Sequence, residues 1–169
     1  MRSARQATRR QSRRFVRGLD LPPAASVRDL LPAVERLSGH PIRLVPAPAG
    51  SAQGVCGIWI RMDGIDYVFV HEDTSRAHQD HIIAHELAHI LRNHQGSLVL
   101  PQANPVTDRL VPTLDPTVVK MMLGRTTYEH QDEKEAELIG TCLQRHVHRT
   151  GPLVGSDRMA RTLLRRGGR

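Results

Sequence analysis

The sequence predicts an α+β domain in which a small, mainly antiparallel sheet packs on helices. Two β-rich runs, residues 55–62 and 65–70, flank Asp63-Gly64, a pair typical of a tight hairpin because both residues tolerate positive φ. Apolar residues then recur with helical spacing between Ser75 and Asn93. With 169 residues, 39% of them hydrophobic, the chain is long enough to form one globular core.

Two helices are expected before the sheet. Residues 4–17 can form a short basic helix that ends at Gly18. Between residues 26 and 37 the apolar positions again follow helical spacing, with Ser26 as a plausible N-cap and Gly39 at the end.

The remaining elements alternate with proline-rich segments. Residues 42–45 are expected to form a strand that is followed by a loop at 46–54. Residues 96–114 contain three prolines and predict irregular structure, and a short helix is expected at 115–123. A long helix at about 129–148 completes the prediction, with a weak basic helix near residues 157–164.

The net charge of +7 comes from the two ends of the chain. Residues 1–17 contain seven Arg and no acid, and residues 156–169 contain five Arg and one Asp. The body, residues 18–155, has 12 basic and 16 acidic residues. Such ends can contact nucleic acid weakly through counterion release, although solvated, partly disordered tails are the simpler interpretation.

These charges suggest three segments: a basic N-terminal extension (1–25), a folded domain (26–150) and a basic C-terminal tail (151–169). No apolar run approaches the roughly 20 residues that span a bilayer, so no membrane contact is expected. Cys56 and Cys142 are isolated thiols, and the N-terminus lacks an apolar signal region. Both observations favour a cytoplasmic protein.

A zinc site is predicted on the helix at 75–93. His85 and His89 are four residues apart, so both imidazoles can reach one ion from the same helix face. Glu86 is rotated by about 100° from His85, which suits a carboxylate beside the metal better than a ligand. Zinc with three protein ligands lowers the pKa of water to about 7, and a nearby carboxylate can take the proton during attack on a peptide carbonyl. The alternative is a helix with surface His residues and an incidental Glu.

The third ligand is expected on the helix at 129–148. The extended three-His motif is excluded, because Arg92 and Gln95 stand where Gly and His are required. Acidic residues cluster downstream, at Glu129, Asp132, Glu133, Glu135 and Glu137.

Within that acidic cluster, Glu133 is the predicted ligand. Glu133 and Glu137 share a face with Gly140, a small residue that permits close helix approach, whereas Glu135 points elsewhere. Glu137 is expected to accept a hydrogen bond from the distal nitrogen of a zinc-bound His. If Glu133 is not the ligand, Glu129, Glu137 and His94 are the alternatives.

These residues resemble the ImmA/IrrE family of metallopeptidases. The resemblance covers roughly residues 26–148 and is carried by His85-Glu86-Leu87-Ala88-His89-Ile90-Leu91 and Glu133-Lys134-Glu135-Ala136-Glu137-Leu138-Ile139-Gly140. It implies a zincin-like minimal domain with one zinc ion on His85, His89 and Glu133, and Glu86 as catalytic base. The chain departs from the family pattern where Glu137 replaces Asn or Asp, Ile139 replaces Phe and Gly140 replaces Ala.

The resemblance also implies a regulatory endopeptidase that cleaves a helix-turn-helix repressor, in some relatives as part of a toxin–antitoxin pair. The alternative is a non-catalytic zinc-containing regulatory or toxin module that binds its partner without cleavage. Tyr128 and His130 are candidate oxyanion stabilisers, although a packed Tyr and a surface His are the simpler interpretations. His81 shares the face of His85 and is expected to line the cleft.

Overall fold

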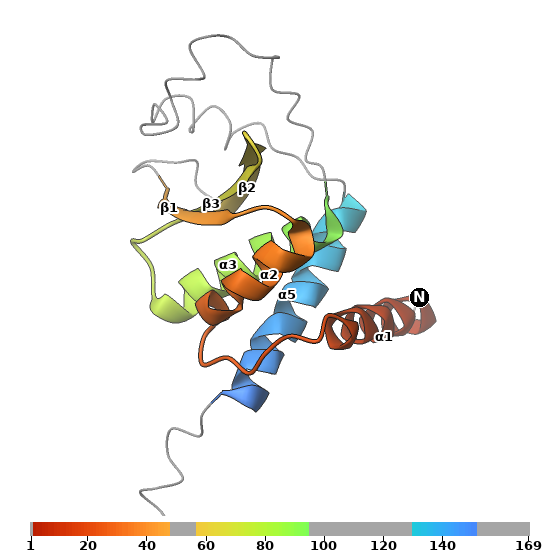
Figure 1. Ribbon diagram of the computed structural model, residues 1–169. Coiled ribbons are helices and arrows are strands. Elements are labelled where there is room, and N and C mark those ends of the chain that lie inside the picture. The colour runs from red at the N-terminus through yellow and green to blue at the C-terminus, as the bar shows by residue number, and fades with distance from the viewer. Residues whose placement is uncertain (1, 48–56, 95–129, 152–169) are drawn as a thin grey trace, which may run out of the picture.

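The computed structural model describes residues 2–47, 57–94 and 130–151 (Figure 1). It confirms the α+β class. The elements are α1 (Arg2–Gly18), the 3-10 helix η1 (Val27–Leu30), α2 (Leu31–Ser38), β1 (Ile42–Pro46), β2 (Gly57–Met62), β3 (Ile65–Val70), α3 (Arg76–Arg92) and α5 (His130–Thr150). The helices predicted at 115–123 and 157–164 lie outside the described residues. No helix among the described elements is both long and apolar enough to cross a membrane.

The three strands form a mixed sheet in the order β1-β3-β2. The predicted hairpin is present: β2 and β3 pair antiparallel, and Asp63 and Gly64 have φ values of 51° and 75° at the turn. The β1–β3 pair is parallel, so the expectation of a mainly antiparallel sheet holds for the hairpin alone. The local sequence pattern identifies strands but does not specify which strand lies in the centre.

The helix predicted at 26–37 is present but divided into η1 and α2. Pro32 has no N–H to donate to the carbonyl oxygen of Arg28, and its ring crowds that carbonyl. The N–H of Leu31 donates to Arg28 instead, which closes a tighter turn. The helix ends as expected at Gly39, whose φ of 77° is left-handed.

Helix α1 is joined to the rest of the molecule. It packs on α5, and Val16 on α1 belongs to the hydrophobic core together with Leu21 and Ala24 in the segment that follows. The backbone N–H of Ala24 also donates to Thr150 Oγ1 over 3.4 Å. This region was expected to be a solvated extension of the domain, but its few apolar residues are enough to attach it to α5.

Helix α3 packs against the sheet on one side and against α5 on another (Figure 1). The two helices come close together at Gly140. A Cβ atom placed there would lie 3.1 Å from the carbonyl oxygen of Ala84 and 3.2 Å from the Cα of His85. The two backbones therefore meet where the His-Glu-x-x-His motif begins.

We predict that Gly140→Val lowers the free energy of unfolding by about 1–3 kcal/mol, since a larger side chain must push α3 and α5 apart. Urea unfolding measures this effect. Gly18→Val is the control, because no atom lies within 4 Å of a Cβ at that position. Equal destabilisation by the two substitutions would show that the helix contact is not the cause.

Candidate metal centre

The two His residues of the motif face one another from successive turns of α3. The helix begins after Ser75, whose Oγ accepts a hydrogen bond from the N–H of His78, and it ends at Asn93. The Nε2 atoms of His85 and His89 are 3.1 Å apart. His89 is fully buried and His85 is partly exposed, so the pair sits at the boundary between core and solvent.

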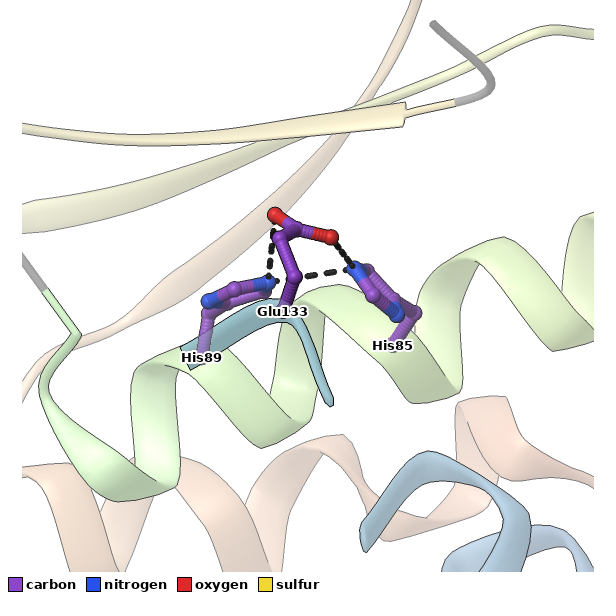
Figure 2. Close-up of side chains that lie close together, drawn as sticks. All are labelled: His85, His89 and Glu133. Carbon is purple, nitrogen blue, oxygen red and sulfur yellow. Dashed lines mark hydrogen bonds and ion pairs between the residues drawn. The ribbon is translucent and has the colours of Figure 1, made fainter. Parts of the chain in front are cut away.

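Glu133 reaches this pair from the first turn of α5 (Figure 2). Its Oε2 is 3.4 Å from His85 Nε2, and its Oε1 is 3.6 Å from His89 Nε2. One donor atom from each of the three residues lies within 4.8 Å of the others. The three residues predicted as ligands are thus brought together, and the group could hold a metal ion.

Glu86 lies beside this group with its side chain almost fully buried. Among the described residues its Oε2 has no hydrogen-bond partner. Burial and, to a smaller extent, the negative charge of Glu133 raise the pKa of Glu86 to about 8, although a hydrogen bond from the Trp59 backbone acts in the opposite direction. The carboxylate is therefore held in an environment that penalises its negative charge.

A second buried histidine, His94, extends the site away from the ligand group. Its Nδ1 is 3.1 Å from Nδ1 of His89, and its Nε2 is 3.2 Å from Oε2 of Glu135. The other oxygen of Glu135 is 3.1 Å from Nε of Arg92. His89, His94, Glu135 and Arg92 thus form a series of polar contacts. The series starts at Nδ1 of His89, the nitrogen that faces away from the candidate metal site.

This series of polar contacts bears on which nitrogen of His89 carries the proton. A neutral His89 that presents the Nε2 lone pair to a metal keeps its proton on Nδ1. That N–H then donates to Nδ1 of His94, and the N–H at Nε2 of His94 donates to Glu135. His94 and Glu135 are therefore placed to orient His89 and to favour the tautomer with its proton on Nδ1.

This role of His94 and Glu135 was not predicted from the sequence. His94 is not on the ligand face of a continuous helix, but Asn93 turns left-handed with φ 50° and reverses the chain there. The N–H of His94 donates to the carbonyl oxygen of His89 over 3.0 Å, which folds its side chain back. A helix-stop residue followed at once by His is the only local signal that could have suggested this.

Glu137 lies next to His85 but not at hydrogen-bond distance. Its Oε2 is 3.7 Å from His85 Nδ1 and 3.6 Å from His81 Nε2. Its influence on His85 is therefore mainly one of charge, a weaker role than the predicted hydrogen bond. His81, which was expected to line the cleft, also lies 3.4 Å from Oε1 of Gln144 through its Nδ1.

Of the two candidate oxyanion stabilisers, only His130 lies among the described residues. His130 is the first residue of α5 and is exposed. Among the described residues it has no hydrogen bond or ion pair with His85, His89 or Glu133. Tyr128 lies outside the described residues, as does Glu129, one of the alternative ligands.

The local electrostatics keep the imidazoles in the form that binds metals. Burial, followed by the proximity of His85 and His94, lowers the pKa of His89 to about 3. Burial also lowers the pKa of His85, although the carboxylates of Glu133 and Glu137 oppose the shift. Both ligand candidates are therefore neutral near pH 7, which removes the need to release a proton before a metal binds.

Comparison of the chain with protein-family models, curated proteins and solved structures found no match. The function of the site must therefore be argued from its own geometry and chemistry.

We predict that His94→Ala weakens zinc binding by about 10- to 100-fold, the usual effect of losing a partner that orients a metal-bound His. His94→Asn should lose less zinc affinity, because the side-chain oxygen of Asn can still accept a hydrogen bond from Nδ1 of His89. Competition with a chromophoric chelator measures both affinities. His78→Ala serves as the control, since His78 is exposed on the first turn of α3. An unchanged affinity in His94→Ala would contradict the proposed orienting role.

We also predict a pH-dependent stability difference between the metal-free wild type and Glu86→Gln. The folded-state pKa of Glu86 is raised to about 8, so its contribution to stability is fully present below about pH 4.5 and is lost as the pH rises through 8. At pH 8 the Gln variant should be more stable by on the order of 2–4 kcal/mol.

Urea unfolding in the presence of a chelator, at pH 4.5 and pH 8, measures this difference. Glu72→Gln controls for the loss of one negative charge, because Glu72 is exposed in the loop before α3. A difference between wild type and Glu86→Gln that is the same at both pH values would rule out a raised pKa for Glu86.

Proposed function

We propose that this protein is a zinc-dependent endopeptidase in which His85, His89 and Glu133 hold one zinc ion and Glu86 is the catalytic base. The donor set supports this assignment. Two neutral imidazoles and one carboxylate suit zinc, whereas calcium and magnesium prefer oxygen ligands throughout. A set of three protein ligands also leaves one position open for chemistry.

The separations of the donor atoms support zinc as well. Tetrahedral zinc with bonds of about 2.0–2.1 Å requires ligand atoms about 3.3 Å apart. The two histidine Nε2 atoms are 3.1 Å apart, Oε2 of Glu133 is 3.4 Å from His85 Nε2, and Oε1 of Glu133 is 3.6 Å from His89 Nε2. With one donor atom from each residue the separations stay within 4.8 Å, so the site would accept the ion once a single Glu133 oxygen moves close to both imidazoles.

The observation that carries the proposal is the buried Oε2 of Glu86, which has no hydrogen-bond partner among the described residues. A buried carboxylate oxygen without a hydrogen-bond partner costs free energy, and such atoms are rare unless they serve a function. A metal site that only stabilised the fold would gain nothing from this carboxylate. A catalytic site requires one beside the ion, because a water molecule must lose a proton there.

The chain's own residues support a simple sequence of proton transfers. A zinc ion held by the three ligands would supply Lewis acidity, polarising a peptide carbonyl and making a nearby water molecule more acidic. Oε2 of Glu86 accepts the proton of that water as it attacks the carbonyl carbon. Glu86 then returns the proton to the leaving nitrogen. The positive charge of the ion also offsets the effect of Glu133, which otherwise favours protonated Glu86.

The edge of the sheet offers a place for a peptide. Strand β2 is an edge strand of the described sheet, and it begins at Gly57. A Cβ at Gly57 would lie 3.1 Å from Oε1 of Glu86, so the absence of a side chain leaves room for the carboxylate. A substrate segment added alongside β2 would run past Glu86. We propose, from the resemblance noted above, that the substrate is a helix-turn-helix repressor and that the reaction takes place in the cytoplasm.

The test combines metal content with cleavage. Zinc-loaded wild type, Glu86→Gln and Glu133→Ala are incubated with a helix-turn-helix repressor encoded beside the gene, and new peptide ends are identified by mass spectrometry. We expect wild type to cut the repressor at a defined bond. Glu86→Gln should retain zinc but cleave at least 100-fold more slowly, in line with loss of a general base. Glu133→Ala should lose tight zinc, whereas the control Glu72→Ala should behave as wild type.

Two results would contradict the proposal. Undiminished cleavage by Glu86→Gln would eliminate Glu86 as the base. Zinc-loaded wild type that binds the repressor without cutting it, with equal binding by Glu86→Gln, would indicate a non-catalytic module instead.

A further inference from the structure

A cleft of about 720 Å³ lies between α1 and the C-terminal half of α5, away from the candidate metal centre. Four Arg side chains line it: Arg13 and Arg17 from α1, and Arg145 and Arg149 from α5. Within each pair the residues are four apart, so both side chains lie on the same face of their helix. All four residues are exposed.

These arginines have no acidic partner in the described part of the chain. None of them takes part in an ion pair with the described residues. The acidic residues of α5 all lie in its first half, between Asp132 and Glu137, and α1 has no acidic residue at all. Two positively charged helix faces thus lie side by side, and their mutual repulsion opposes the packing of α1 on α5. A bound anion would remove that cost.

The composition of this surface indicates what kind of anion fits. The positive charge of α1 comes from Arg alone, and the Arg guanidinium group binds phosphate through two parallel hydrogen bonds. Arg9, Arg10 and Arg14 are also exposed, so the charge continues along α1 beyond the cleft. A single small anion would not use this extended surface, whereas a polymer of phosphates would.

Other extended anions fit less well. A helix that lies on a membrane needs a free apolar face, but the apolar residues Val16 and Phe15 of α1 are packed against the core. The cleft lining contains no Phe, Tyr or Trp among the described residues, so it offers no aromatic platform for reading bases. Contacts here would be to the backbone of the polymer and insensitive to its sequence.

The geometry points to this cleft and the adjoining arginine face of α1 as a binding site for the phosphate backbone of nucleic acid, without sequence preference. The site is separate from the proposed zinc centre. Arg145 follows Glu133 by twelve residues, which corresponds to about 18 Å along α5. Nucleic-acid binding at this cleft therefore does not require zinc. It can be tested separately from the proposed peptidase activity.

The test measures binding of the full chain to a fluorescein-labelled single-stranded DNA of mixed sequence, by anisotropy between 50 and 200 mM NaCl. The variants are Arg13→Gln/Arg17→Gln and Arg145→Gln/Arg149→Gln. The matched control is Arg36→Gln/Arg43→Gln, which removes two exposed positive charges from α2 and β1. Urea unfolding of each variant checks that the fold is retained.

We expect each cleft variant to bind DNA at least tenfold more weakly at 50 mM salt. The slope of log affinity against log salt should become shallower by about 1.4, since each lost phosphate contact on a single strand contributes about 0.7. The control should keep the wild-type slope, a DNA of scrambled sequence should bind equally, and a chelator should have no effect.

The proposal is overturned if the control weakens binding as much as the cleft variants, because the effect would then be one of net charge. It is also overturned if poly-glutamate or vesicles with anionic lipid bind more tightly than DNA and depend more strongly on the four arginines. Tighter binding of poly-glutamate would assign the cleft to an acidic protein segment, and tighter binding of vesicles would assign it to a membrane surface.

Discussion

The candidate metal centre depends on how closely α5 approaches α3. Gly140 has no side chain, so the backbone of α5 can pass next to Ala84 and His85. Glu133 is seven residues earlier, two helical turns along the same face of α5. Because the crossing point and this spacing are both fixed, the Glu133 carboxylate arrives opposite His85 and His89 without help from a loop. A site built on two packed helices is held more precisely than one built on mobile segments.

The chemistry of the site follows from what the fold buries. His89 and the carboxyl group of Glu86 are both buried in the core. Burial lowers the pKa of His89 and raises the pKa of Glu86, so the neutral form of each is favoured. In a core with purely structural functions such groups would be replaced by apolar ones, since their burial is unfavourable. Their presence next to one another is the basis for proposing that the site binds a cation and that Glu86 moves a proton. On that proposal, the burial that weakens the metal-free fold would also prepare the site for its ligand.

Local sequence signals predicted the helices that the structure describes, the hairpin, and three residues that the structure brings together. The capping residues Ser75 and Gly39 and the turn at Asp63 act through their immediate neighbours, so their effects can be read from short segments. The spacing of His85 and His89 is equally local. Glu133 could be chosen as the candidate ligand because few carboxylates share a helix face with a small residue.

The features that were missed depend on contacts between distant segments. The position of β3 between β1 and β2 is decided by how the sheet packs, and the attachment of α1 is decided by α5. The contact between His94 and Glu135 spans 41 residues, so neither residue is distinctive without the other. Pro32 is an exception, because its effect is local and follows directly from its missing N–H.

The left-handed residue at the end of α3 has a consequence for recognising such sites in other sequences. Asn93 ends the helix, turns His94 back to His89, and accepts a hydrogen bond from Arg61 of β2 through its own Oδ1 over 3.0 Å. A Gly there would keep the turn but would release the hairpin from the helix end. We therefore expect a search pattern with Asn and His four and five residues after the second motif His, together with a Glu two positions beyond the downstream candidate ligand, to favour sites with an oriented His over chance His-Glu-x-x-His matches.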